Sequence, residues 1–326
     1  MRAREYFEAG LRAHQAGDLR SAVQAYQAGL ALAPDDAQGL NLLGAALVQA
    51  GNPAAALPHL ERVTRAQRNN AGVLGNLAQA YFAVGRYDEA RETFRKASLI
   101  DPREPHFQLG IANSLAMQGR LTEAEPLLQR LVQRFPAEPL AHFNYGNVLR
   151  ELGRTREALE QFARTVALSP EFAEARNNLA GALHKLQRFA DAEREFRACV
   201  EQAPDYLLAH CNLASVLIDL GRFAEAEAEC RQVLHADPQM TIGHTYLGAA
   251  LGHQGRLVEA LRSHEAAAAV HDSAQTVQAY AGALAEVGRY AESLRWFCRA
   301  FTYDPDSVPA HQVLGERVDS RAGVQH

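Results

Sequence analysis

Apolar and small residues recur along the chain in a fixed order with a period of 34 residues. In each period, positions 4, 7, 8 and 11 fall on one face of a first helix, and positions 20, 24 and 27 form a similar apolar stripe on a second. A fixed period of this length is typical of stacked helical repeats. The pattern predicts a nine-unit array over residues 1–306, with units that start near residues 3, 37, 71, 105, 139, 173, 207, 241 and 274.

Small residues and helix breakers occupy the same places in almost every unit. Position 15 is glycine in every unit except the sixth, which has Gln187, and in the ninth the glycine comes one residue early. Position 8 is always Gly or Ala and position 20 is Ala or Ser, which lets two helices approach closely. Pro58 and Pro126 both fall at position 22, and we expect them in the unpaired first turn of the second helix. The eighth unit has Asp272 in place of the usual Pro and is one residue short, which predicts a local irregularity near residues 270–275.

These fixed positions resemble those of the tetratricopeptide repeat (TPR) family. The segment NLAQAYFAVGRYDEARETFRKASLIDP (76–102) shows the small residue at 8, Gly at 15, Ala at 20, the aromatic residue at 24 and Pro at 32. The resemblance covers about residues 3–306. It implies an all-α fold, a right-handed TPR superhelix (α-solenoid) of about nine helix-turn-helix units in one elongated domain.

The C-terminal segment has the pattern of a single further helix. Residues 307–318 space apolar side chains as a first helix without its partner, so we expect a C-terminal capping helix there and a flexible tail over 319–326. The alternative is a junction to a further domain.

Composition excludes some partners and favours a cytoplasmic protein. The net charge of −5 argues against nucleic acid, whose phosphates require a basic surface. The N-terminus has no apolar run and already fits the first repeat, so we expect neither a signal peptide nor a membrane anchor. The four cysteines show no paired spacing, and we expect buried, reduced thiols.

The sequence contains no recognisable catalytic or metal-binding motif. Neither a phosphate-binding glycine loop, a nucleophile elbow, an HExxH nor a CxxC motif is found. His142, His210, His244 and His311 share position 4, so their spacing follows the repeat itself. We therefore expect no enzyme activity, no cofactor and no metal site.

Polar residues form a stripe that packing does not require. Positions 2, 6, 9 and 13 share one face of the first helix, which lines the concave groove in the geometry of the family. Asparagine is a poor interior helix former, yet it returns at position 6 in four units. One explanation is a hydrogen bond between repeats, and the other is contact with a ligand. The predicted peptide-binding residues are Asn76, Gln79, Asn113, Asn144, Asn147, Arg150, Asn178, His184, Lys185, Asn212 and Ser215.

The asparagine ladder is similar to that of the superhelical TPR domain of O-linked N-acetylglucosamine transferases, whose asparagines grip a substrate polypeptide. The resemblance assigns this role to Asn76, Asn144, Asn178 and Asn212. The chain departs from this ladder where Leu42, Gly110, Tyr246 and Ala279 stand at position 6, so the ladder is central and interrupted.

We expect a non-enzymatic scaffold that binds a protein or an extended peptide in its groove. The alternatives are the substrate-recruiting arm or subunit of a protein-modifying enzyme, such as a glycosyltransferase or hydroxylase, and a purely structural array. The basic residues of the chaperone-type carboxylate clamp are missing at position 5, so acidic chaperone tails are not expected partners. The oligomeric state stays open.

Overall fold

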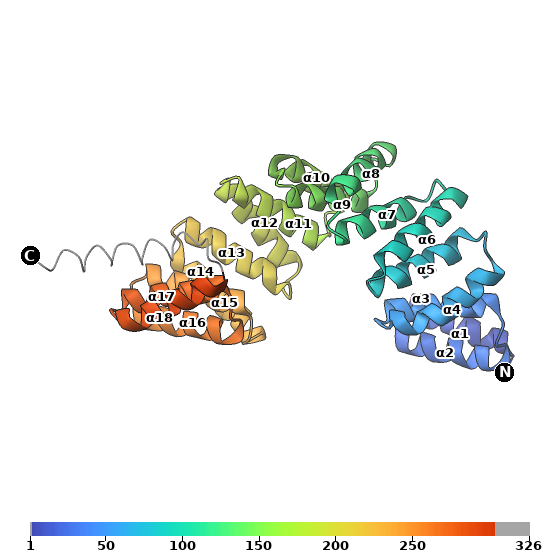
Figure 1. Ribbon diagram of the computed structural model, residues 1–326, viewed down its shortest axis with the longest axis horizontal. Coiled ribbons are helices and arrows are strands. Elements are labelled where there is room, and N and C mark those ends of the chain that lie inside the picture. The colour runs from blue at the N-terminus through green and yellow to red at the C-terminus, as the bar shows by residue number, and fades with distance from the viewer. Residues whose placement is uncertain (1, 304–326) are drawn as a thin grey trace, which may run out of the picture. The chain divides into compact units, whose positions relative to one another are not determined.

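The computed structural model describes residues 2–303, which contain eighteen α-helices and no strand (Figure 1). The predicted all-α helical repeat is confirmed. The capping helix over 307–318, the tail over 319–326 and His311 lie outside the described residues. The helices are α1 (Ala3–Gln15), α2 (Leu19–Leu32), α3 (Ala37–Gln49), α4 (Pro53–Ala66), α5 (Ala71–Ala83), α6 (Tyr87–Ile100), α7 (Pro105–Met117), α8 (Leu121–Arg134), α9 (Pro139–Glu151), α10 (Thr155–Leu168), α11 (Ala173–Lys185), α12 (Phe189–Gln202), α13 (Leu207–Asp219), α14 (Phe223–Ala236), α15 (Thr241–His253), α16 (Leu257–Val270), α17 (Ala274–Glu286) and α18 (Tyr290–Tyr303).

The described helices divide into two compact units, α1–α10 and α11–α18, and the division falls between Pro170 and Glu171, at the end of the fifth repeat. Within each unit, every helix packs against the next one along the chain. Each odd-numbered helix also contacts the next odd-numbered helix of its unit. The first helices of successive repeats therefore lie side by side, and their polar faces are neighbours.

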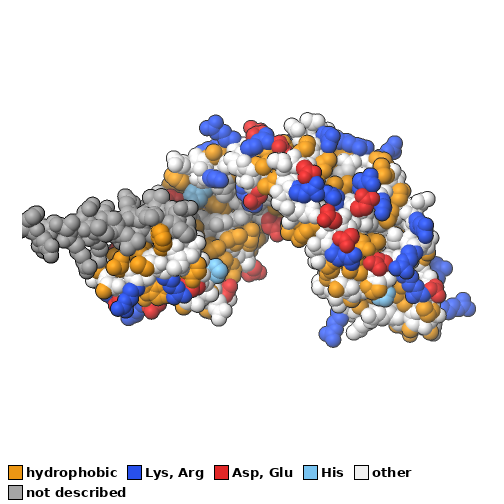
Figure 2. Space-filling view, in the orientation of Figure 1, with side chains coloured by type: hydrophobic (Ala, Val, Ile, Leu, Met, Phe, Trp, Pro, Cys, Tyr) orange, Lys and Arg blue, Asp and Glu red, His pale blue; other side chains and the backbone are white. Residues whose placement is uncertain are grey.

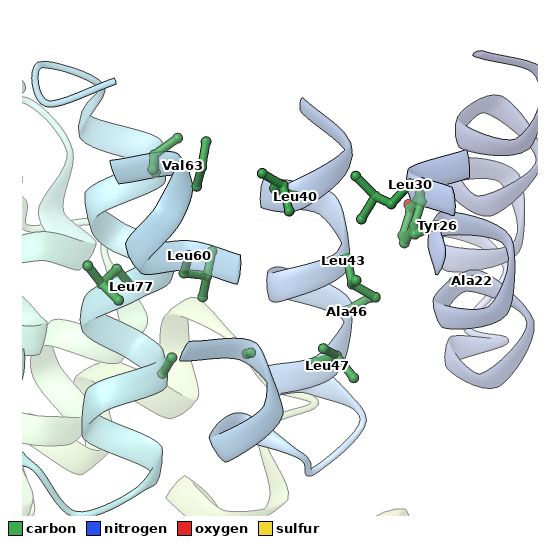
Figure 3. Packing of buried hydrophobic residues seen from close by; sticks show 13 residues of the cluster. Ala22, Tyr26, Leu30, Leu40, Leu43, Ala46, Leu47, Leu60, Val63 and Leu77 are labelled. Carbon is green, nitrogen blue, oxygen red and sulfur yellow. The ribbon is translucent and has the colours of Figure 1, made fainter. Parts of the chain in front are cut away.

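Small residues at position 8 make room for large ones at position 24. A Cβ atom added to Gly10 would lie 2.5 Å from the Tyr26 ring, and one added to Gly146 would lie 2.6 Å from Phe162. Both large side chains are fully buried. The same arrangement brings Tyr26, Leu43 and Leu60 into one cluster (Figure 3). The pattern of small and large positions read from the sequence is therefore a steric requirement.

The glycine at position 15 ends the first helix in a left-handed conformation. Its φ lies between 73° and 82° in the eight repeats that have it, and Gln187 adopts a φ of 59° in the sixth. The chain closes each turn with the same bonds: Arg188 N donates to Leu183 O, as Asp18 N does to Ala13 O. A side chain is disfavoured in this conformation, which explains the recurring glycine.

In seven repeats the residue after this turn is an arginine, which holds the start of the second helix. It pairs with a carboxylate three residues on, at distances from 2.5 to 2.8 Å. In three repeats it also reaches the preceding second helix, where the acceptors are Glu125, Glu193 and Glu227. Glu227 is only 6 % exposed; it accepts hydrogen bonds from Arg256 and Gln254 and forms an ion pair with Arg231. In these three repeats the arginine thus links one repeat to the repeat before it. The pairs are Arg86–Glu89, Arg120–Glu123, Arg154–Glu157, Arg188–Asp191, Arg222–Glu225, Arg256–Glu259 and Arg289–Glu292.

Two local expectations have different outcomes. The loop between α16 and α17 is one residue shorter than the other loops between repeats, and Ser273 and Thr276 close it with a capping box. The short loop agrees with the missing residue, and the irregularity of the superhelix at this point stays a prediction. The expectation for the internal prolines was wrong, because Pro58 and Pro126 are the sixth residues of α4 and α8 and lie beyond the first turn. Both helices continue past the proline and omit one backbone bond.

Candidate functional site

The predicted peptide-binding residues all lie on odd-numbered helices. In the first unit, α5 carries Asn76 and Gln79, α7 carries Asn113, and α9 carries Asn144, Asn147 and Arg150. In the second unit, α11 carries Asn178, His184 and Lys185, and α13 carries Asn212 and Ser215. We call the asparagine and glutamine residues of this set the amide stripe. Its members are Asn76, Gln79, Asn113, Asn144, Asn147, Asn178 and Asn212.

Two asparagines of the amide stripe bond to the preceding repeat. Asn76 Nδ2 donates to Asn41 Oδ1 at 2.9 Å, and Asn212 Nδ2 donates to Asn177 Oδ1 at 2.9 Å. Each pair joins position 5 of one repeat to position 6 of the next, 35 residues on. A carboxamide has two donor hydrogens and an acceptor oxygen with two lone pairs, so this bond leaves the side chain able to bind a ligand.

A second pair of positions, near the end of the first helix, also joins side chains of successive repeats. His14 Nε2 lies 2.9 Å from Gln49 Oε1, and His184 Nε2 lies 2.5 Å from Asp219 Oδ2. Both pairs are again 35 residues apart, from position 12 to position 13. His184, which we predicted to contact a ligand, therefore also serves as a link between repeats.

The other predicted residues have different surroundings. Among the described residues, the side chains of Gln79, Asn113 and Asn144 make no hydrogen bond; Asn113 and Asn144 are half-buried and Gln79 is exposed. Arg150 pairs with Glu151 at 3.1 Å, and Lys185 is exposed at the end of α11. Gln79, Asn113 and Asn144 are therefore the amides whose presence the internal bonding of the fold explains least.

The structure brings Asn76 and Gln79 together in a hollow of about 300 Å³ between α5 and α7. Glycines on α5 keep the hollow open, because a Cβ on Gly72 would meet only Asn70 Oδ1, at 3.5 Å. The rings of Phe94 and Phe107 supply apolar walls. We call this the Asn76 hollow, and its lining is Gly72, Gly75, Asn76, Gln79, Phe94, Glu104, His106 and Phe107.

The charge of the Asn76 hollow comes from one carboxylate. Glu104 caps α7 by accepting from His106 N at 3.2 Å, and its Oε1 lies 2.5 Å from His106 Nδ1. The hydrogen bond from the His106 side chain and the one from its backbone hold the pKa of the Glu104 carboxyl below its usual range. No Lys, Arg or Asp lines the hollow, so Glu104, paired with His106, is the acidic side chain of its lining. Elsewhere, acidic and basic side chains are interspersed over the visible face (Figure 2).

Several lining residues of the hollow escaped the sequence analysis. His106 lies at position 2 of the fourth repeat, on the face of the stripe, but neither it nor Glu104 nor the two α5 glycines is among the predicted contacts. A signal for the bonded pairs was present, because Asn41 and Asn177 stand 35 residues before Asn76 and Asn212. The hollow had no such signal, because it depends on which side chains are missing.

The histidines at position 4 have a repeated structural role. His142 Nε2 lies 3.2 Å from Pro136 O, His210 Nε2 lies 3.1 Å from Pro204 O, and His244 Nε2 lies 2.9 Å from Pro238 O. Each therefore ties the start of a first helix to the loop before it. No group of three or more His, Cys, Asp or Glu side chains in the described part of the chain is arranged to hold a metal ion.

The cysteines follow the expectation in three cases out of four. Cys199, Cys211 and Cys230 are buried, but Cys298 is exposed on α18, so the expectation of buried thiols was wrong there. Burial raises the pKa of Cys211 and of Cys230 to about 12. These two thiols are therefore poor nucleophiles at neutral pH. Within residues 2–303, no helix is long and apolar enough to cross a membrane.

The paired helices, left-handed turns and small-to-large contacts define a helical-repeat protein. Models of the tetratricopeptide repeat match residues 7–71 and 141–206, 47–114 and 187–242, and 105–148. The matches run together from residue 7 to residue 242. The chain belongs to the tetratricopeptide repeat family, and this membership favours a non-catalytic protein-interaction scaffold. Among curated proteins, no sequence matches the chain.

Solved structures of low sequence identity share the fold. A chain of the APC/C hetero-tetramer Cut9-Hcn1 aligns with a TM-score of 0.63 and 18% identity, over 82% of this chain and 53% of that one. A tetratricopeptide repeat protein from Parabacteroides merdae ATCC 43184 aligns with a TM-score of 0.61 and 17% identity, over 75% of this chain and 97% of that one. PilW, a type IV pilus biogenesis factor, aligns with a TM-score of 0.58 and 19% identity, over 64% of this chain and 98% of that one. This chain thus spans about half of the Cut9-Hcn1 chain.

Proposed function

We propose that the chain is a non-enzymatic scaffold that binds an extended polypeptide segment on the faces of its odd-numbered helices. The amide stripe forms hydrogen bonds with the main chain of the segment. The observation that carries the proposal is the Asn76 hollow, where Asn76 and Gln79 stand beside an opening that glycines keep clear.

The chemistry of the amide stripe suits a peptide backbone. A peptide group offers one N–H and one C=O, and a carboxamide side chain can pair with both. Each such bond contributes about 0.5–1.5 kcal/mol net, so several are needed for useful affinity. Recognition of this kind depends little on the side chains of the bound segment.

The spacing of the repeats suits an extended segment. Packed helices lie about 8–10 Å apart, and an extended chain advances about 3.3 Å per residue. A bound segment therefore passes one odd-numbered helix about every three residues. Within a unit, the amides of successive helices meet the segment at this interval.

The test starts from a library of random linear 12-residue peptides, selected on the immobilised full-length chain. Binding of the selected peptides is measured by fluorescence anisotropy with the wild type and with a Gln79→Ala/Asn144→Ala variant. Neither side chain makes a hydrogen bond within the described residues, so the variant should keep its thermal midpoint. We expect it to bind about tenfold or more weakly. N-methylation of single peptide bonds in the ligand should also weaken binding.

The matched control is Gln129→Ala/Gln133→Ala, which removes two exposed amides from α8. The control should bind like the wild type. Equal affinity of the wild type and the Gln79→Ala/Asn144→Ala variant, or failure to select any peptide, would contradict the proposed function.

A further inference from the structure

The Asn76 hollow has the shape and charge to receive one long basic side chain. Its volume of about 300 Å³ is at the lower end of the range for small-molecule pockets, so a single side chain is a better fit than a cofactor. The buried rings of Phe94 and Phe107 form apolar walls, and the Glu104 carboxylate lies on the same hollow. The lining thus combines walls for a methylene stem with an acceptor for a cation.

We propose that the Asn76 hollow binds a lysine or arginine side chain of the peptide segment. This inference rests on the proposed function and specifies the sequence preference of that site. The stem of the side chain lies along the Phe94 and Phe107 rings, and its cationic group pairs with Glu104. Long basic side chains commonly bury their stems against apolar surface in this way.

The polar groups of the hollow support a cation over an anion. The contacts of Glu104 with His106 are both made through Oε1, so the second carboxylate oxygen remains as the acceptor for the ligand. The side-chain oxygens of Asn76 and Gln79 add two acceptors on the α5 side. Because Lys and Arg are missing from the lining and His106 is engaged with Glu104, a bound carboxylate would meet the Glu104 carboxylate with no unengaged basic side chain in the lining to pair with.

The structure supplies a matched control for Glu104. Glu138 occupies the same position in the next repeat, precedes a proline as Glu104 does, and caps α9 by accepting from Leu140 N at 3.3 Å. Glu104→Gln and Glu138→Gln therefore lose the same charge and perturb the same kind of helix cap. Only Glu104→Gln changes the Asn76 hollow.

The experiment measures the dissociation constants of peptides selected on the full-length chain, with each Lys or Arg replaced in turn by norleucine. One replacement should weaken binding to the wild type and to Glu138→Gln by about tenfold or more. The same replacement should have no effect with Glu104→Gln, because its partner is already missing. A double-mutant cycle between Glu104 and the peptide residue isolates this coupling.

A second variant blocks the hollow without touching its charge. Gly72→Leu places a side chain where a Cβ would make one ordinary contact, at 3.5 Å from Asn70 Oδ1, so the chain should fold as usual. We expect this variant to lose the preference for the basic residue. Selected peptides that lack Lys and Arg, or a norleucine effect that persists in Glu104→Gln, would overturn the inference. If those peptides still depend on Gln79 and Asn144, the proposed function survives and only the basic preference fails.

Discussion

Two places in the molecule share the same bond between repeats but differ in everything around it. Asn76 and Asn212 stand four repeats apart, and each donates to an asparagine of the preceding repeat at 2.9 Å. Around Asn76, α5 has glycine at positions 2 and 5, and a hollow opens beside Glu104. Around Asn212, the equivalent positions hold Leu208 and Cys211, and Met240 stands in place of Glu104.

The difference shows how one backbone gives two surfaces. At the second place, the Cys211 thiol is buried and its Sγ lies 3.9 Å from Met240 Sδ. Leu208 and Ile242 are 37% and 42% exposed there, so the surface beside Asn212 is apolar. The repeat therefore sets the bond, while the residues at positions 2, 5 and 34 set the chemistry that a partner meets.

The largest expected effect is in thiol reactivity, which reports how closely Cys211 is packed in the surface beside Asn212. A pKa of about 12, against an ordinary value near 9, lowers the thiolate fraction about a thousandfold below pH 9. With excess Ellman's reagent at pH 8, the native chain should release one equivalent of the chromophore quickly, from the exposed Cys298. In denaturant all four cysteines should react.

The Cys298→Ser variant is the control for this assay. It should show no fast phase in its native state, since the remaining thiols are buried. A fast phase that persists in Cys298→Ser and disappears when Cys211 is also replaced by Ser would mean that the surface beside Asn212 opens, and the contrast with the Asn76 hollow would be lost.

The two glycines of the Asn76 hollow should respond differently to a methyl group. A Cβ on Gly75 would lie 2.7 Å from Phe107 Cε1, whereas one on Gly72 has only an ordinary contact. We expect Gly75→Ala to lower the free energy of unfolding by about 1–3 kcal/mol relative to Gly72→Ala. Urea unfolding of both variants, followed by circular dichroism, measures the difference. Equal stabilities would show that Phe107 turns aside at little cost.

The fold could be predicted almost entirely from the sequence, because the same residue types recur at the same positions in nearly every one of the nine repeats. The glycine at position 15 predicts a left-handed turn, and the pairing of Gly146 with Phe162 is visible as a small and a large position 16 residues apart. Single exceptions were harder to interpret. Gln187 keeps the turn without glycine, and Pro58 lies deeper in its helix than position 22 suggested.

The candidate site could be predicted only in part. Periodicity places Asn76 and Gln79 on one face of a helix, but it does not say which neighbouring side chains leave space. The Asn76 hollow depends on Gly72 and Gly75 in one repeat and on Glu104 and His106 at the start of the next. Those residues lie up to 34 positions apart and belong to no common motif, so their proximity becomes visible only once the helices are packed.

The smallest difference should be in the stability that is lost when each bonded asparagine is removed. This difference tests how far the bonds at Asn76 and Asn212 are equivalent. Asn177 is only 5% exposed, whereas Asn41 is half-buried, so loss of the donor costs more at Asn177. We expect Asn212→Ala to lower the free energy of unfolding by about 1–3 kcal/mol and Asn76→Ala by about 1 kcal/mol. Asn144→Ala, which removes an amide without a bond inside the described residues, should change stability little. Urea titrations of the three variants measure this order directly. If Asn144→Ala lowered the free energy of unfolding as much as Asn212→Ala, structural amides could not be distinguished from ligand-facing ones. The choice of binding variants depends on that distinction.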